Sequence, residues 1–222
     1  MCGRFSLVTD MSRLEARFGF DADGLLYRPS FNVAPTQEIL TVVNDAFQNQ
    51  PRMMKWGLLP YWYKGFGIGS RMINARAETL TDKPGFRQAF RDRRCLIIAD
   101  GFYEWKKSAG KGVPMRIALG SGEPFGFAGL WEAWQSPAGE VVYSCAIITT
   151  GPNSVMASIH DRMPVILPRE SEAYWLDHSH RDFSSLRMLL QPYVAGTVNV
   201  FEISTLVNSP SNDTCDVIVR VK

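Results

Sequence analysis

Short extended runs dominate this sequence and limit the folds that it can adopt. Each run is rich in β-branched or aromatic residues and is bounded by Gly, Pro, Asn or Asp, which is typical of β-strands. Because the runs are many and irregular and helical segments are few, they favour a curled, mostly antiparallel sheet. The predicted strands are 39–43, 52–58, 95–99, 102–106, 115–119, 125–131, 141–149, 198–203 and 217–221.

Helical periodicity is confined to short segments. Residues 11–18 follow Asp10, a suitable N-cap, and precede Gly19, with Leu14 and Phe18 on the inward face. Neither a repeat nor a linker divides the 222 residues, a length that one domain can hold. We therefore expect a single α+β domain over residues 1–222, with further short helices at 85–91, 153–159, 170–176 and 183–190.

Composition excludes several protein classes. With 45% hydrophobic and 21% charged residues the chain is neither disordered nor fibrous. No apolar run approaches the roughly 18 residues of a membrane span, and the first residues do not resemble a secretory signal. The cysteines at 2, 95, 145 and 215 lack C-x-x-C spacing. We expect a soluble protein of a reducing compartment, cytoplasmic and nucleoid-associated if bacterial, without disulfides, metal or cofactor.

Positive charge is concentrated in one window of the sequence. Residues 83–116 contain nine Lys or Arg and three acids, a net charge of +6, whereas the whole chain carries only +2. A solvated basic surface explains such a window, but so does a surface that binds the phosphates of a nucleic acid.

Cys2 is the residue with the most distinctive chemistry. If the initiator Met1 is removed, Cys2 carries a thiol and a free α-amine on adjacent carbons. The amine titrates near 7.7–8.0 and the thiol near 8.5, so both have a reactive fraction at neutral pH, and the nearby Arg4 would lower the thiol pKa further. Such an aminothiol can act as an N-terminal nucleophile, or condense with an aldehyde to form a thiazolidine ring. Alternatively, Cys2 is merely the residue that follows Met1.

Three further residues are suited to proton transfer or substrate positioning. Strand alternation places Glu104 on the same face as Phe102, opposite Tyr103 and Trp105, where burial would raise its pKa. The alternative is a rim carboxylate paired with Lys106. His160 and Asn74 are a candidate acid or base and a candidate orienting amide, or else a packed imidazole and a turn cap.

An aromatic segment, WGLLPYWY at 56–63, lies beside Pro and Gly residues. Core packing would bury some of these rings. Trp62 and Tyr63, which continue into Lys64 and Gly65, are predicted to be available for stacking on nucleic-acid bases.

Together these segments resemble the SOS response-associated peptidase family, whose members are also described as abasic-site processing proteins. The resemblance covers about three-quarters of the chain, in the order of the family, and only residues after about 170 match loosely. The matching stretches are MCGRF (1–5), FNVAPTQ (31–37), WGLLPYW (56–62), INARAET (73–79), RCLIIADGFYEWKK (94–107) and IHDRMPVIL (159–167).

The resemblance implies a β-barrel-like core and a positively charged groove for single-stranded DNA. It also implies that Met1 is removed, by self-cleavage or an aminopeptidase, and that Cys2 links covalently to the ring-opened aldehyde of an abasic site. By position, Cys2 is the nucleophile, Asn74 positions the amino terminus or sugar, and Glu104 and His160 transfer protons. The residues assigned to DNA are Arg4, Arg76 and Arg162 for phosphates, and Trp62 with Tyr63 for a base.

The resemblance makes the chain a DNA-damage response protein that acts as a monomer, with peptidase activity in self-processing and lyase activity at abasic sites as further expectations. One alternative is an N-terminal-nucleophile amidohydrolase, because glutamine amidotransferase domains also begin Met-Cys-Gly. Such an enzyme would hydrolyse glutamine without DNA. A second alternative is a plain single-strand-binding module, which would leave no adduct on a denaturing gel.

Overall fold

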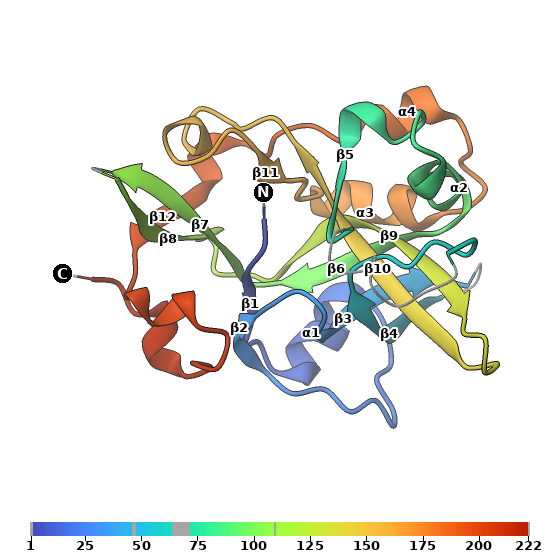
Figure 1. The fold of residues 1–222 in the computed structure, drawn as a ribbon, viewed down its shortest axis with the longest axis horizontal. Coiled ribbons are helices and arrows are strands. Elements are labelled where there is room, and N and C mark those ends of the chain that lie inside the picture. Colours follow the sequence, from blue (N-terminus) through green and yellow to red (C-terminus); the bar gives the residue numbers. More distant parts are fainter. Residues whose placement is uncertain (1, 46–47, 64–71, 109, 222) are drawn as a thin grey trace.

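Five strands close into a barrel at the centre of the molecule (Figure 1). The computed structural model describes residues 2–45, 48–63, 72–108 and 110–221. In ring order the barrel strands are β10 (Val141–Thr150), β4 (Asn49–Trp56), β3 (Glu38–Asn44), β6 (Arg94–Ala99) and β9 (Phe125–Gln135). The ring closes because β10 pairs with both β9 and β4. This confirms the predicted α+β class with a curled, mostly antiparallel core.

The join between β10 and β4 differs from the other ladders of the ring. It is parallel and short, and pairs Ser144 with Lys55 and Cys145 with Trp56. Beyond that join, β10 pairs in parallel with β5 (Asn74–Arg76), and it pairs with β11 (Met163–Pro164) in antiparallel fashion. The carboxyl-terminal half of β10 therefore places residues from distant parts of the sequence side by side.

A second, five-stranded sheet lies against one end of the barrel and extends as a long ribbon on the left of Figure 1. Its central strand, β7, pairs with β1, so the amino-terminal segment runs beside the sequence that follows β6. In sheet order its strands are β12 (Val198–Glu202), β8 (Lys111–Leu119), β7 (Gly101–Ser108), β1 (Phe5–Leu7) and β2 (Ser30–Val33).

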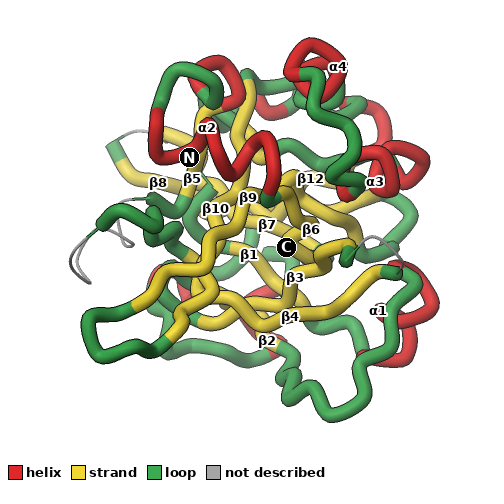
Figure 2. The backbone as a smooth tube through the Cα atoms, turned by 90° about the vertical axis from the view of Figure 1, so that its right-hand side faces the viewer, coloured by secondary structure: helices red, strands yellow, loops and turns green. Residues whose placement is uncertain are grey.

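Alternation along the barrel strands separates two cores. On β6, Cys95 and Ile97 join the apolar cluster that also holds Cys2, whereas Leu96 and Ile98 pack with residues of the helices. The helices accordingly lie around the periphery of the strands in Figure 2. They are α1 (Met11–Phe18), α2 (Pro84–Asp92), α3 (Arg169–Leu176) and α4 (Phe183–Met188), with short 3-10 helices at Ala77–Thr79, Met156–Ser158, Ala195–Thr197, Thr205–Asn208 and Cys215–Ile218.

Helix α1 has the predicted bounds. The Asp10 side chain accepts a hydrogen bond from the Arg13 N–H, and Gly19 ends the helix in the left-handed conformation with φ of 65°. Leu14 and Phe18 are buried on its inner face.

Two predicted elements are wrong. The strand predicted at 217–221 is replaced by a 3-10 helix over Cys215–Ile218, because Val217 packs into a small apolar cluster around Tyr103. Only an isolated antiparallel bridge between Arg220 and Ile203 follows it. The helix predicted at 153–159 is reduced to a 3-10 turn at Met156–Ser158. Its Ser158 hydroxyl donates to the Val155 carbonyl, a local bond that competes with helix propagation.

Arg94 is completely buried between two helix ends. Its guanidinium donates to main-chain carbonyls at the carboxyl-terminal ends of α2 and α3 and in the turn that follows, those of Phe90, Arg91, Trp175, Asp177 and His180. Burial lowers its pKa to about 10, so it stays charged at neutral pH. It therefore satisfies carbonyls that helix ends leave without partners and compensates their partial negative charge.

Candidate functional site

Cys2 is fully buried and lies in the same apolar cluster as Ile147, Ile159 and Met163. Its backbone carbonyl accepts a hydrogen bond from Asn74 Nδ2 at 2.7 Å. Asn74 begins β5, and its pairing with Ile147 of β10 fixes its position. Asn74 Oδ1 is buried and accepts no hydrogen bond from the described residues, so an acceptor beside Cys2 remains available for a substrate or amine group.

Glu104 faces the same site from β7. It is only 3% exposed, which excludes a rim carboxylate paired with Lys106. The predicted alternation is confirmed, because Phe102 packs in the cluster of Cys2 whereas Tyr103 and Trp105 pack in a separate cluster. Burial raises the pKa of Glu104, although the charge of His160 lowers it in part.

The Cys2 thiol is protonated in this environment. Burial raises its pKa, and the negative charge of Glu104 raises it further. A contact with the Arg4 backbone lowers the thiol pKa, as expected of this residue, but burial outweighs it. The Arg4 guanidinium instead donates to Asn32 Oδ1 at 2.9 Å and to the Val207 carbonyl at 2.8 Å. Through these bonds it holds the amino-terminal segment against the carboxyl-terminal part of the chain.

His160 follows the Met156–Ser158 turn and acts electrostatically on Glu104. Its Nδ1 accepts the Arg162 backbone N–H at 3.0 Å and lies 2.9 Å from the Asp161 carboxylate. The ring nitrogen is therefore in reach of both a backbone donor and a carboxylate acceptor.

The residues assigned to DNA differ in their present contacts. Arg76 is exposed at the end of β5. Arg162 is bound to both carboxylate oxygens of Glu78, at 2.7 and 2.9 Å, and to the Thr149 carbonyl at 2.6 Å. The hydrogen bond from Arg162 lowers the pKa of Glu78.

The aromatic segment divides between core and surface. Trp56 is fully buried, whereas Trp62 is 49% exposed. Of these two tryptophans, only Trp62 has a ring available for stacking. Tyr63 is half-buried and meets Trp62 edge to face with ring centroids 6.4 Å apart. Trp134 Nε1 donates to the Tyr63 carbonyl and anchors this end of the loop.

Comparison with known proteins identifies the family of this chain. The family model described as SOS response associated peptidase (SRAP) matches residues 1–210. The chain belongs to the SOS response associated peptidase family. It is 49% identical to the abasic site processing protein YoqW of Bacillus subtilis over 98% of this chain and 99% of the relative. It is 28% identical to the abasic site processing protein HMCES of Xenopus tropicalis over 87% of this chain and 67% of the relative.

Solved structures agree with the fold of this SOS response associated peptidase family member. A crystal structure of a Bacteroides thetaiotaomicron protein covers both chains completely, with a TM-score of 0.90 and 26% identity. A phage-related protein of Bordetella bronchiseptica matches 92% of this chain and 95% of its own with a TM-score of 0.71 and 26% identity.

The basic window of this family member is not one continuous patch. Arg94 is buried, Arg93 contacts Glu132 at 2.8 Å, and Arg116 contacts Asp100 at 3.5 Å. The remaining cations lie apart, because β7 and α2 lie on opposite sides of the molecule in Figure 1. Charge counted along the sequence therefore overstates the local field.

Sequence reasoning missed Glu78 as a partner of Arg162. The INARAET stretch places it two residues after Arg76, a spacing that could have indicated a carboxylate among the phosphate-binding cations. The pairing with Arg162 itself depends on the fold, since 84 residues separate the two.

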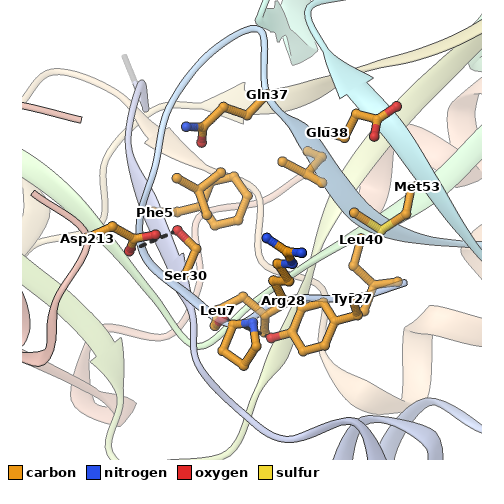
Figure 3. Close-up of a pocket in the computed structure, with 13 residues that line it drawn as sticks. Phe5, Leu7, Tyr27, Arg28, Ser30, Gln37, Glu38, Leu40, Met53 and Asp213 are labelled. Carbon is orange, nitrogen blue, oxygen red and sulfur yellow. Dashed lines mark hydrogen bonds between the residues drawn. The ribbon is translucent and has the colours of Figure 1, made fainter. Parts of the chain in front are cut away.

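A cavity of about 200 Å³ lies elsewhere, where β1 and β2 meet β3 (Figure 3). Its walls include apolar side chains such as Leu7 and Met53, with Arg28 and Glu38 among its charged residues. It includes none of the predicted site residues. Within the residues described, no cluster of three His, Cys, Asp or Glu could hold a metal ion, and no helix has the length and apolarity to cross a membrane.

Proposed function

We propose that this chain captures abasic sites in single-stranded DNA through Cys2, after hydrolysis of the Met1–Cys2 bond. The observation that carries the proposal is the convergence on Cys2 of Asn74, which binds its carbonyl, and Glu104, whose charge acts on its thiol. The names of the relatives, abasic site processing proteins, support the substrate class.

The reaction needs no reactant beyond the sugar aldehyde and the aminothiol. The α-amine of Cys2 attacks the C1′ aldehyde, and loss of one water gives an imine. The thiol then adds to the imine carbon, its proton passes to the nitrogen, and a thiazolidine ring closes. The net change is one carbonyl and one aminothiol converted to one thiazolidine and one water.

Proton transfer determines the assignment of roles. A buried thiol with a raised pKa is a poor nucleophile until a base removes its proton, and Glu104 is the carboxylate whose charge reaches it. His160, which acts electrostatically on Glu104, is assigned to protonate the departing sugar oxygens. Asn74 orients the amine or the sugar through its buried Oδ1.

Specificity follows from the lesion itself. An abasic sugar presents an aldehyde, so no base edge has to be read, and contacts to phosphates and stacking on a neighbouring base are sufficient. We assign these contacts to Arg4, Arg76 and Arg162 and to Trp62 with Tyr63. The imine also acidifies the C2′ proton of the sugar, so lyase activity is assigned to the stage before ring closure.

Mass spectrometry with a matched cysteine control tests the proposal. Wild-type protein and Cys215→Ser, which changes an exposed cysteine, should lose Met1 and form a heat-stable adduct equal in mass to chain plus DNA less one water. Cys2→Ser retains an amine for the imine but has no thiol for ring closure, so its adduct should be lost on heating. An equally heat-stable adduct of Cys2→Ser would show that the thiazolidine assignment is wrong.

A further inference from the structure

We propose that the pocket between α2 and Tyr61 binds a nucleotide that flanks the abasic site on the same DNA strand. Its phosphate would contact Arg87 and Arg91, and its base would stack on Tyr61. The inference rests on the proposed function for the identity of the strand and adds a second point of attachment to it.

The pocket combines cationic and aromatic side chains on one surface. It has a volume of about 320 Å³, and its lining is contributed by the aromatic segment, α2 and α4, through Tyr61, Pro84, Arg87, Gln88, Arg91 and Phe183. Tyr61 is 64% exposed, although large aromatic rings usually pack inside. An exposed ring beside two guanidinium groups is the combination that single-stranded nucleic acids use, because rings stack on bases while cations hold phosphates.

The amphipathic pattern of α2 explains why these side chains point outward. Phe86, Ala89 and Phe90 are buried against the barrel, which leaves Arg87 and Arg91 on the opposite face one turn apart. Arg91 contacts Asp92 at 3.1 Å. Arg87 makes no ion pair with any residue that the structure describes, so its charge is available to a phosphate.

The first turn of α2, which contributes Pro84 to the pocket, lies against Trp62 and Met72. Asn74, which binds the Cys2 carbonyl, lies two residues after Met72 in the sequence. The first turn of α2 packs against Met72. A Cβ at Gly85 would lie 3.2 Å from Met72 Cε and 4.0 Å from Trp62. In Figure 1, β5 lies between the amino-terminal segment near the centre of the view and α2 at the right. A strand that places its lesion at Cys2 and a base on Trp62 therefore reaches Tyr61 and α2 next.

Gly85 allows this close approach. A Cβ at this position would lie 3.2 Å from Met72 Cε, so the Met72 side chain would have to shift. The first turn of α2 thus packs closely against Pro60, Trp62 and Met72.

Binding measured with an unreactive analogue separates this inference from the crosslinking chemistry. The probes are single strands with a tetrahydrofuran abasic analogue, which has no aldehyde, flanked by one nucleotide on each side or extended by four on the 5′ or the 3′ side. We expect one of the extended probes to bind wild-type protein more tightly than the short probe. Tyr61→Ala should reduce that gain by about tenfold, the loss of one stacked base. Arg87→Ala should lower the slope of log K against log salt by about 0.7 for one phosphate.

The matched control is Arg28→Ala, an exposed arginine on the loop before β2 that lies outside this pocket. It should leave the gain from extension unchanged, and all variants should bind the short probe within about twofold of wild type. Equal effects of Arg87→Ala and Arg28→Ala on the extended probe would overturn the inference, as would a loss that is the same for short and extended probes. If wild-type protein shows the gain but never crosslinks natural abasic DNA, the pocket stands and the proposed function fails.

Discussion

Arg94 and Glu104 are both buried charged residues on consecutive strands, β6 and β7, yet their surroundings differ. Arg94 donates to five main-chain carbonyls, and its pKa of about 10 leaves it charged throughout the physiological range. Glu104 faces a thiol and an imidazole, and burial moves its pKa upward, toward the pH at which the protein works.

The difference shows how burial serves two purposes in one fold. Arg94, whose guanidinium donates to fixed carbonyl oxygens, stabilises the ends of two helices and stays protonated. A buried carboxylate with a raised pKa, placed beside a nucleophile, can accept and return a proton, at a cost in stability. Burial alone does not identify a functional residue, whereas the direction of the pKa shift and the chemistry of its neighbours do.

Replacement of Arg94 should have the largest effect. Arg94→Met leaves several buried carbonyls without donors, each costing about 1–3 kcal/mol, so we expect a loss of about 3–5 kcal/mol in the free energy of unfolding. Denaturant titration measures it, with Arg181→Met, an exposed arginine near the same helix end, as the control. Crosslinking by the folded fraction should be unchanged. If Arg94→Met is as stable as wild type, Arg94 does not stabilise the helix ends.

Replacement of Glu104 should affect chemistry more than folding. Glu104→Gln should slow crosslinking by about 10–10⁴-fold, the usual contribution of a general acid or base, and His160→Gln should do the same. Neither should abolish non-covalent DNA binding, and each should remove one limb of the pH–rate profile. Rates equal to wild type across pH 5–9 in both variants would mean that Cys2 reacts through its intrinsic chemistry alone.

The pH dependence of stability sharpens the same comparison. Because the pKa of Glu104 is raised in the folded chain, its favourable contribution is complete below the ordinary glutamate pKa of about 4.3. That contribution is lost as pH rises through the folded-state value. Thermal unfolding of Glu104→Gln should therefore match wild type near pH 4 and exceed it near pH 7, by about 2–4 °C for each kcal/mol. A destabilised variant at pH 7 would contradict the assignment.

The aromatic segment allows a smaller test of the same kind. Trp62→Ala should weaken binding of single-stranded DNA by about 1–3 kcal/mol, because the half-exposed ring stacks on a base, while the melting temperature stays near that of wild type. Trp56→Ala, a substitution in the core, should instead cost about 3–5 kcal/mol of folding stability. A large fall in melting temperature for Trp62→Ala would place that ring with the core.

The smallest expected effect concerns two arginines assigned to phosphates, the exposed Arg76 and the mostly buried Arg162. Arg76→Ala and Arg162→Ala should each reduce the salt dependence of binding by about 0.7 in the slope of log K against log salt, equally for all sequences. Arg162 has to exchange Glu78 for phosphate, so Glu78→Gln should strengthen binding in low salt. An unchanged slope for Arg162→Ala would remove that residue from the DNA contacts and leave it, like Arg94, a structural arginine.

Local signals were sufficient for much of the fold. The cap at Asp10 and the glycine at 19 fixed α1, and β-branched runs located the long strands of the barrel. The two-residue strand β11 and the three-residue strand β5 lack such a signal, because they exist only through their pairing with β10. Barrel closure likewise depends on the parallel contact between β4 and β10, which no local pattern encodes.

The candidate site was partly predictable for the same reason. Period-two alternation on one strand indicated the inward direction of Glu104, and that was correct. Its proximity to Cys2, the bond from Asn74 to the Cys2 carbonyl and the pairing of Arg162 with Glu78 join segments that are far apart in the chain. The burial of Arg94 could not be predicted either, because the number of charged residues in a sequence window does not show which of them are buried.

The placement of Cys2 has a consequence for biosynthesis. The first residues leave the ribosome long before the strands that enclose them, since the site requires β7, the closing strand β10 and finally His160. At about 5–20 residues per second, synthesis of that much chain takes roughly 8–30 s. During this interval the bond before Cys2 is accessible, and afterwards folding encloses the cysteine. Removal of Met1 by an aminopeptidase would therefore have to precede folding, whereas self-cleavage would require the assembled site.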